Sequence, residues 1–338
     1  MSDSPPPPTP DAGRVGSGQV GAGSRVPAGA TDQEAWLAGL IERARSVDGQ
    51  PPFSDGSLVG LAHGERRLVR HEQSAAIVTT AKRGTNEAEF VVEPDARRHG
   101  LGRALLHELL VAAPGDLLLW SHGDHPGARA LALHFGLQPV RELLQLRAGV
   151  VGRGGVKAGD GAGGAVGEIS TSSIREGGRV SIRPAANSTS GGPEWRDAWV
   201  ELNARAFAGH PEQGAVTRAD LDTLMHEKWF DPDDVLLAWD GDKLVGYCWL
   251  KVEHDQDDAG TNSIGEFYVV GVAPEWQGRG LGRQLVAAGL ARLAERGIRE
   301  ANLYVEGDNA AALRLYRSFG FDQHSIDVQY RWRSEPDD

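Results

Sequence analysis

Residues 271–285 read Gly-Val-Ala-Pro-Glu-Trp-Gln-Gly-Arg-Gly-Leu-Gly-Arg-Gln-Leu and join an apolar run to an amphipathic one. Glycine occupies every second position from 278 to 282, where the missing Cβ lets backbone amides approach a ligand closely. The helix predicted to follow begins with unpaired N–H groups and the positive end of its dipole, which together bind anions. Arg279 and Arg283 add positive charge, so the segment predicts a cradle for a pyrophosphate group.

The same segment occurs a second time in the chain. Residues 91–105 read Val-Val-Glu-Pro-Asp-Ala-Arg-Arg-His-Gly-Leu-Gly-Arg-Ala-Leu and align without gaps to 271–285 at an offset of 180. Downstream, a Gly-Asp pair precedes a Phe-Gly pair with the same spacing in 123–136 and in 307–320. Self-similarity of this kind predicts two copies of one fold.

Composition divides the 338 residues into four parts. Residues 1–30 are rich in Pro, Gly and Ser, and residues 149–178 are rich in Gly, so we expect a disordered tail and a flexible linker there. The folded copies are predicted at 31–148 and 179–334. Two domains also agree with the length, at roughly 150 residues per domain.

Hydrophobic periodicity in the second copy predicts the order β-α-α-β-β-β-α-β-α-β-β. This order predicts an α/β fold, a mixed and mostly antiparallel sheet with helices on both faces. The principal elements expected are helices at 195–207, 218–229, 281–294 and 309–319, strands at 180–183, 235–239, 243–252, 265–273 and 301–305, and two closing strands.

Several classes of protein are excluded or disfavoured by composition. The 35 basic and 47 acidic residues give a net charge of −12, which disfavours nucleic-acid binding. One cysteine, Cys248, cannot form an internal disulfide or a cysteine-based zinc site. We expect no membrane partner, since apolar runs fall short of about 18 residues. We also expect no metal. The protein is predicted to be cytoplasmic and monomeric.

Two other folds use glycine-rich loops for phosphates. A Rossmann fold places an acidic residue about 20 positions further on, where Arg299 follows Ile298 here, and a P-loop carries a Lys-Ser/Thr pair after its glycines. Neither signature is present in the sequence.

Two motifs instead resemble the Gcn5-related N-acetyltransferases (GNAT). The run from Val272 to Gly282, Val-x-Pro-x-x-Gln-x-x-Gly-x-Gly, is similar to the acetyl-CoA signature of that superfamily. The run from Asn309 to Phe321, Asn-x-x-Ala-x-x-x-Tyr-x-x-x-Gly-Phe, is similar to its second motif. The resemblance implies acetyl-CoA as co-substrate and tandem GNAT folds.

Further segments resemble the mycothiol synthase family. They are Phe207–Gly214, Trp229–Pro232, Gly265–Val272 and Leu303–Asn309, and with the tandem halves they cover nearly all of both copies. This resemblance implies transfer of an acetyl group to the cysteinyl amine of cysteinyl-glucosaminyl-inositol, by direct attack in a ternary complex. The alternative is a GNAT enzyme acting on another small-molecule or protein amine, and a third possibility is a non-catalytic acetyl-CoA-binding module.

Direct attack requires a base, an acid and no enzyme nucleophile. Glu266, on the strand that would flank acetyl-CoA, is assigned as the base acting through water, and Tyr316 as the acid for the CoA sulfur. Cys248 is interpreted as a core residue rather than a nucleophile. By resemblance the substrate is contacted by Asp55, where the family commonly has Glu, and by Glu212, Lys251, Glu266 and Tyr304.

The predicted cofactor contacts lie in both copies. In the second copy they are Val270, Gly271, Val272, Gln277, Gly278, Arg279, Gly280, Leu281, Gly282, Arg283, Asn309, Ala310, Ala311, Ala312, Leu313 and Arg314. In the first copy they are Phe90, Val91, Val92, Arg98, His99, Gly100, Leu101, Gly102 and Arg103.

The repeat alignment predicts that the two copies differ in chemistry. The first copy has Ala132 at the position of Tyr316 and His125 at that of Asn309. Counting back eight residues from the proline, it has Asn86 at the position of Glu266. We therefore expect a first copy that keeps its phosphate cradle and can bind acetyl-CoA, but does not catalyse; alternatively, its loop only supports the fold.

Overall fold

The computed structural model of the chain describes residues 32–79, 86–150, 180–188, 195–208, 213–252 and 264–334. The predicted tail, nearly all of the predicted linker and the candidate substrate residue Glu212 lie outside them. The described residues form two compact units. The N-terminal unit contains those up to Arg147 with Tyr304–Arg314 and those from Asp322 onward, and the C-terminal unit contains Ala148–Leu303 and Leu315–Phe321.

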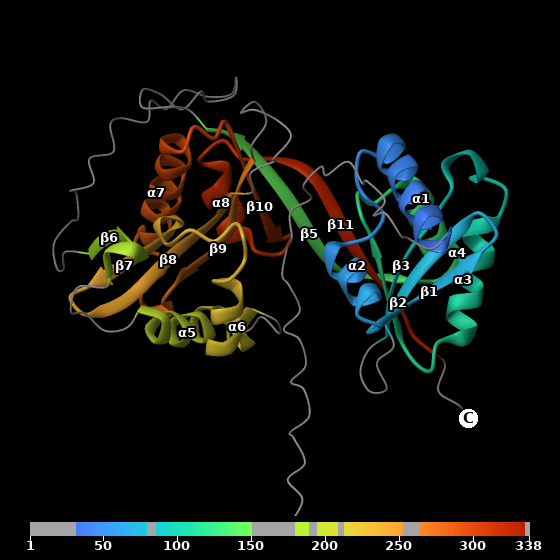
Figure 1. Ribbon diagram of the computed structural model, residues 1–338, viewed down its shortest axis with the longest axis horizontal. Helices are drawn as coiled ribbons and strands as arrows, with labels where there is room; N and C mark the ends of the chain where they lie inside the picture. Colours follow the sequence, from blue (N-terminus) through green and yellow to red (C-terminus); the bar gives the residue numbers. More distant parts are fainter. Residues whose placement is uncertain are drawn as a thin grey trace, which may run out of the picture. The chain divides into compact units, whose positions relative to one another are not determined.

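The N-terminal unit has a six-stranded sheet in the order β1-β2-β3-β4-β11-β5 (Figure 1). Its neighbouring strands are antiparallel except β3 and β4. An apolar cluster beneath α1 and α2 fills one face, and a second beneath α3 and α4 fills the other. The elements are α1 (Asp32–Asp48), α2 (Asp55–Ala62), β1 (Arg66–His71), β2 (Ser74–Thr79), β3 (Asn86–Val92), α3 (Leu101–Ala112), β4 (Leu117–Ser121), α4 (Pro126–Phe135), β5 (Gln138–Gly149) and β11 (Asp322–Trp332).

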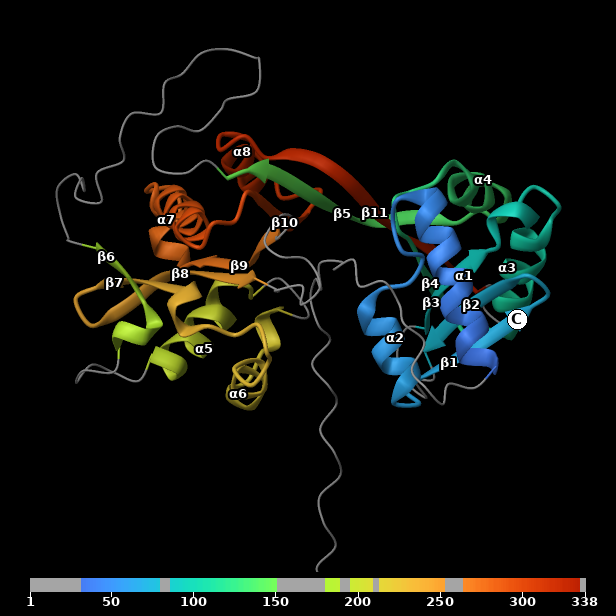
Figure 2. The ribbon, with the colours of Figure 1, turned by 45° about the horizontal axis from the view of Figure 1, so that its top comes forward.

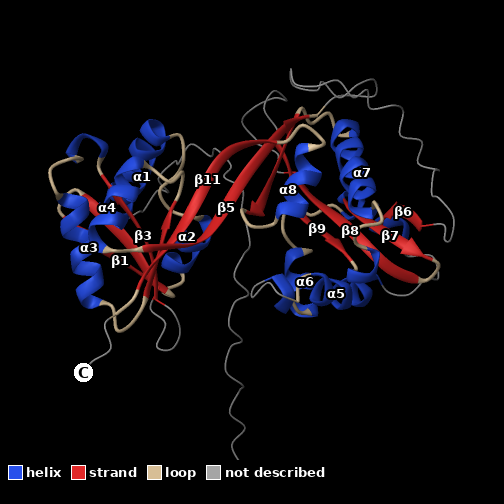
Figure 3. Cartoon of the chain, turned by 180° about the vertical axis from the view of Figure 1, so that it is seen from behind, coloured by secondary structure: helices blue, strands red, loops and turns tan. Residues whose placement is uncertain are grey.

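The C-terminal unit carries the order β10-β9-β8-β7-β6, in which β9 and β10 are the parallel pair. Helices α5 and α6 cover one face of this sheet and α7 covers the other (Figure 3). The elements of the second copy are β6 (Val180–Pro184), α5 (Trp195–Ala206), α6 (Arg218–Leu224), β7 (Val235–Asp240), β8 (Lys243–Val252), β9 (Ile264–Val272), α7 (Leu281–Glu295), β10 (Glu300–Glu306) and α8 (Ala310–Arg317), and, of these, residues 304–314 belong to the N-terminal unit. The predicted fold class, with mostly antiparallel mixed sheets and helices on both faces, is confirmed.

Two local predictions are wrong. The helix predicted at 218–229 starts as expected, because Thr217 and Asp220 form a capping box, but it ends at Leu224 with Met225 as its C-cap. A turn bonding Phe230 N–H to the Glu227 carbonyl follows, so Trp229 lies in a loop rather than on a helix.

The chain closes with one long strand instead of the two predicted. This strand, β11, lies in the sheet of the N-terminal unit, between β4 and β5. Figure 2 shows β5 and β11 running side by side. The last strand of the second copy therefore completes the sheet that contains the first copy.

A β-bulge distinguishes the two copies. In the C-terminal unit Trp249 pairs with Val269 while the next residue, Leu250, pairs with Phe267, so β9 carries one extra residue, Tyr268. In the N-terminal unit the described pairs run without a shift from Ser74↔Val92 to Val78↔Ala88. Because of the extra residue, each β9 residue before Tyr268 pairs one position away from where a regular strand would place it.

Within the described residues, none of the helices has the length and apolarity needed to cross a membrane. The same residues contain no group of three or more His, Cys, Asp or Glu side chains arranged to hold a metal ion.

Candidate active site

The glycine-rich loop between β9 and α7 has the geometry of an open anion cradle. Gly278 and Gly280 have φ values of 72° and 83°, in the left-handed region that favours glycine. No described atom lies within 4 Å of a Cβ built at either position, and no described side chain caps α7 at Gly280. Gln277 fixes the loop by donating from Nε2 to the Val272 carbonyl at 3.2 Å. The first amides of α7 are thus left to a ligand.

Two arginines hold positive charge at this loop. The Arg279 guanidinium lies 5.5 Å from the ring centre of Trp276. Arg283 lies 4.9 Å from the Phe319 ring and donates to Ser318 Oγ at 2.9 Å. Ring contacts of this kind restrain the guanidinium groups without neutralising them.

The end of β9 lies beside the loop and has main-chain groups that the sheet does not use. Among the described residues, the ladder between β9 and β10 comprises four pairs and ends at Leu303↔Phe267, whereas β9 continues to Val272. A ligand can pair with such a segment as an added strand does. Glycine is required at Gly271, because a Cβ there would lie 2.5 Å from the Tyr247 ring.

Helix α8 carries the predicted acid. Tyr316 is buried and packs against Phe321, with ring centres 5.8 Å apart. Burial, and to a smaller extent the Cys248 thiol, raises the pKa of Tyr316 above its ordinary value, so the phenol keeps its proton. Asn309 caps this helix, since its Oδ1 accepts from the Ala312 amide at 3.0 Å.

A row of three polar residues crosses the sheet at the bulge. Glu266 on β9 is paired in register with Lys251 on β8 and with Asn302 on β10. All three side chains are buried, with exposed fractions of 6%, 8% and 5% for Glu266, Lys251 and Asn302. Paired residues of adjacent strands point to the same face, so this row places an acid, a cation and an amide together.

Aromatic side chains flank the row on the α5 and α6 face. Lys251 Nζ lies 5.5 Å from the ring centre of Trp229, and Trp229 packs on Tyr268 at 5.3 Å. Phe267, by contrast, faces α7, where a Cβ at Gly289 would lie 2.5 Å from its ring. Glu266 therefore faces the aromatic side of the sheet and not α7.

Comparison with known proteins identifies the family. The sequence profile of the acetyltransferase (GNAT) family matches residues 32–137 and 196–321. The chain is 43% identical to a mycothiol acetyltransferase of Clavibacter sepedonicus, over 98% of this chain and 99% of that protein. The chain belongs to the mycothiol acetyltransferase family of GNAT enzymes. A second such relative, from Geodermatophilus obscurus, is 40% identical over 88% of this chain and 93% of its own length.

Solved structures agree on the fold. A GCN5-related N-acetyltransferase from Sphaerobacter thermophilus matches with a TM-score of 0.60 at 21% identity, covering 89% of this chain and 92% of that chain. A tandem GNAT protein from the clavulanic acid biosynthesis pathway matches with a TM-score of 0.59 at 16% identity, covering 91% and 97%. At these low identities, the structural similarity supports the fold and nothing further about the acetyltransferase.

The remaining candidate residues of the acetyltransferase are placed as follows. Asp55 is the first residue of α2, after the N-cap Ser54. The Tyr304 hydroxyl accepts from Gln145 Nε2 at 3.0 Å. Cys248 is buried, and burial raises the pKa of its thiol, so a thiolate nucleophile is disfavoured.

The N-terminal unit of the acetyltransferase repeats the cradle with different residues at 97–99. Gly100, with φ of 91°, heads α3 as Gly280 heads α7. Arg97 donates from Nε to the Val92 carbonyl at 3.1 Å, the bond that Gln277 makes in the other copy. Arg98 adopts φ of 67° where the second copy has Gly278, so a side chain occupies a strained left-handed position.

The structure corrects the residue that corresponds to Glu266 in the first copy. The described pairs show a bulge in β9 and no register shift in β3. Counting back from the proline therefore matches the wrong residues, by one position, for every β9 residue that precedes Tyr268. The counterpart of Glu266 is Glu87, not Asn86. The first copy therefore does have a carboxylate at this position.

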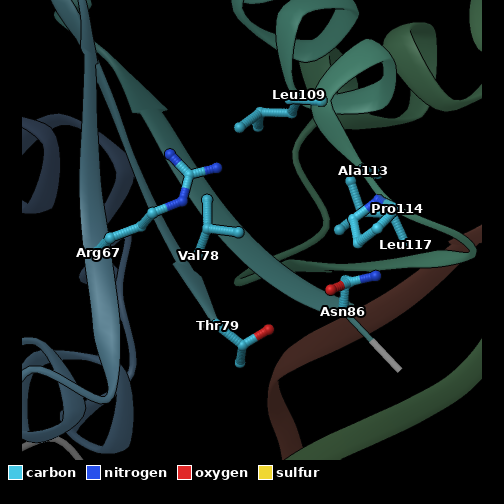
Figure 4. Close-up of a pocket in the computed structure, with 9 residues that line it drawn as sticks. Arg67, Val78, Thr79, Asn86, Leu109, Ala113, Pro114 and Leu117 are labelled. Carbon is cyan, nitrogen blue, oxygen red and sulfur yellow. The ribbon is translucent and has the colours of Figure 1, made fainter. Parts of the chain in front are cut away.

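The surroundings of Glu87 and Asn86 support the correction. Asn86 lines a cavity of about 280 Å³ on the α3 side, with Leu109 and Ala113 (Figure 4). The second copy has Gly265 and Leu293 at the positions of Asn86 and Ala113, and a Cβ on Gly265 would overlap Leu293. The shorter Ala113 thus leaves open in one copy the space that leucine fills in the other.

The Glu87 carboxylate is held by the protein. Arg66 Nη2 donates to Oε2 at 2.8 Å, while Trp120 Nε1 and Gln329 Nε2 donate to Oε1 at 2.8 and 3.1 Å. Three donors from the protein thus hold the Glu87 carboxylate in place.

Sequence reasoning missed a buried charged network next to Glu87. His122 contacts two carboxylates, Glu89 at 3.6 Å and Asp327 at 3.0 Å, and Glu89 also accepts from Ser54. Burial alone would lower the pKa of His122, but the hydrogen bond to Asp327 and the nearby Glu89 carboxylate raise it from 6.5 to about 10. No local signal in the sequence links His122 to Asp327, because 205 residues separate them.

Proposed function

We propose that this acetyltransferase transfers the acetyl group of acetyl-CoA to the cysteinyl amine of cysteinyl-glucosaminyl-inositol, giving mycothiol and CoA. The names of relatives at 40–43% identity support this acceptor. The single structural observation that carries the proposal is Glu266, a buried carboxylate on β9 one residue before the ladder to β10 ends.

The donor is proposed to bind at the C-terminal cradle. Acetyl-CoA supplies an acetyl thioester, whose C–S bond breaks as the N–C bond to the amine forms. Residues 277–283 would hold the pyrophosphate through amides and arginines, and Val270, Gly271 and Val272 would pair with the acetyl and pantetheine groups. The first turn of α8, from Asn309 to Arg314, is proposed to contact the pantetheine arm. Open left-handed glycines at this cradle support the fit.

Two residues are proposed to move protons. Glu266 takes a proton from the acceptor amine through a water, which frees the nitrogen lone pair for attack. Tyr316 gives a proton to the departing sulfur. Burial raises the pKa of Tyr316, so the phenol carries this proton at neutral pH.

The sugar and inositol groups are proposed to contact polar residues, namely Asp55, Glu212, Lys251 and Tyr304. Asp55 is one methylene shorter than the Glu common in the family, so its contact with a hydroxyl is the weakest part of the set. Lys251 beside Trp229 offers both a cation and an aromatic surface to the acceptor.

The first copy, residues 31–148, is proposed to be non-catalytic and to retain the ability to bind acetyl-CoA at residues 98–103. Glu87 is held by Arg66, and Ala132 replaces the tyrosine acid. Isothermal titration with acetyl-CoA measures the number of sites. One site in the wild-type protein that disappears on altering the C-terminal cradle would reject binding by the first copy.

A thiol-release assay tests the main proposal. The protein is mixed with acetyl-CoA and either the cysteinyl pseudodisaccharide or a panel of other amines, including an aminoglycoside and a peptide N-terminus. Turnover with the pseudodisaccharide is expected at the highest kcat/KM. Turnover confined to another amine would reject this acceptor while leaving the acetyltransferase assignment intact.

A further inference from the structure

Asn302 on β10 has a buried carbonyl oxygen with no hydrogen-bond partner among the described residues. Only 5% of the residue is exposed. An unpartnered buried acceptor is costly to the folded state, so native proteins rarely retain one unless a ligand or water satisfies it. This oxygen therefore points to a donor that the described residues do not provide.

The position of Asn302 indicates what that donor is. Asn302 is in register with Glu266, the proposed base, and Lys251 lies on the other side of Glu266. An amine that transfers a proton toward Glu266 has further N–H groups to place. A neutral amide oxygen can accept one of them without removing the proton, whereas a cation such as Lys251 cannot accept any.

We propose that Asn302 Oδ1 binds the amine of the acetyl acceptor and orients its nitrogen lone pair for attack. This inference rests on the proposed function to the extent that Glu266 faces the acceptor amine. Proton transfer toward Glu266 exposes the nitrogen lone pair, and a remaining N–H held by Asn302 would fix the rotation of the amine about its C–N bond, which sets the direction of that lone pair.

The first copy of the fold provides an internal comparison. Its counterpart of the pair Glu266 and Asn302 is Glu87 and Leu118, which are likewise in register. Thr79 bonds to the Glu87 backbone where the second copy has Lys251. The copy whose carboxylate is held by Arg66 thus also has an apolar residue in place of the amide. Loss of an acceptor-binding role in that copy would account for both differences.

The leucine of the first copy suggests the decisive variant, Asn302→Leu. Because the oxygen has no partner among the described residues, its removal is expected to leave the melting temperature unchanged or raised. In contrast, kcat/KM for the amine is expected to fall at least 10-fold, with the KM for acetyl-CoA within twofold of wild type. A residue with only a structural role would not give this combination.

Asn203 offers a matched control. It is also a buried asparagine, but its side chain bonds to the Gln213 carbonyl and the Tyr247 hydroxyl. Asn203→Leu is therefore expected to lower the melting temperature, which shows that the assay detects the loss of a satisfied amide. A retained kcat/KM in Asn302→Leu, or a melting temperature lowered as in Asn203→Leu, would overturn the proposal.

The experiment uses whichever amine the wild-type protein acetylates fastest. Failure of the wild type to use the cysteinyl pseudodisaccharide would reject the proposed acceptor. A variant that equals wild type with the preferred amine would reject the role of Asn302, so the two failures are distinguishable.

Discussion

Raising the pH from 6 to 10 is expected to destabilise the N-terminal unit through one residue, His122. Its imidazolium lies between Glu89 and Asp327, only 10% of its side chain is exposed, and it stacks beside Trp120. The folded pKa of about 10 lies above the 6.5 of an exposed histidine. The ion pairs therefore contribute fully below pH 6.5 and are lost as the pH rises through 10.

The magnitude follows from the same shift. From 6.5 to about 10 is 3.5 pKa units. At 1.36 kcal/mol per unit, His122 contributes at most about 5 kcal/mol to the free energy of unfolding, reached below pH 6.5. This contribution is comparable to the stability lost when one partner of a buried ion pair is removed, about 3–5 kcal/mol.

Urea unfolding of the wild type and His122→Gln between pH 6 and 10 tests this prediction. The difference in free energy of unfolding is expected to be several kcal/mol at pH 6 and to shrink steadily above pH 7. His71→Gln serves as the control, because His71 meets one exposed partner, Glu108. A His122→Gln difference that stays constant across the range, or that matches His71→Gln, would refute the charged state assigned to His122.

Three further predictions concern the catalytic unit. Glu266→Gln should lower kcat by about 100-fold or more, because the amide cannot accept the amine proton. Steady-state kinetics at saturating acetyl-CoA measures this change, and near wild-type turnover would show that Glu266 is not the base. Tyr316→Phe should lower kcat by about 10²-fold and leave the KM for the amine little changed, since only the leaving sulfur loses its proton source; an unchanged kcat means that water supplies that proton. Gly280→Ala should weaken acetyl-CoA binding by about 5- to 100-fold, in line with a strain of about 1–3 kcal/mol at a left-handed residue. The matched variant Gly100→Ala should leave turnover unchanged, and equal effects of the two on kcat would contradict a single catalytic cradle.

The predictions that succeeded rest on local patterns. Alternating glycines before an amphipathic run require a tight loop, and the structure has left-handed residues at 278 and 280. The duplicated segment at 91–105 and 271–285 predicted two copies of one fold, which the family match to both halves confirms. These patterns lie within short segments of the chain, so they can be recognised from the sequence alone.

The comparison of the two copies failed at one residue for a physical reason. Strand residues alternate between faces, so an error of one position moves a side chain to the opposite face of the sheet. A gap-free alignment has no means of detecting the bulge at Tyr268, and it selected Asn86 in place of Glu87.

The sequence by itself determined the family, the duplication and the glycine-rich loop that is proposed to hold a pyrophosphate, because those depend on the order of residues within short segments. Only the tertiary structure decided which residues meet across strands. Pairing between β8, β9 and β10 brings Lys251, Glu266 and Asn302 into one row. The insertion of β11 beside β4 brings Asp327 to His122. Strand pairing joins residues that are far apart in the chain, and the periodicity of one strand carries no record of its partner.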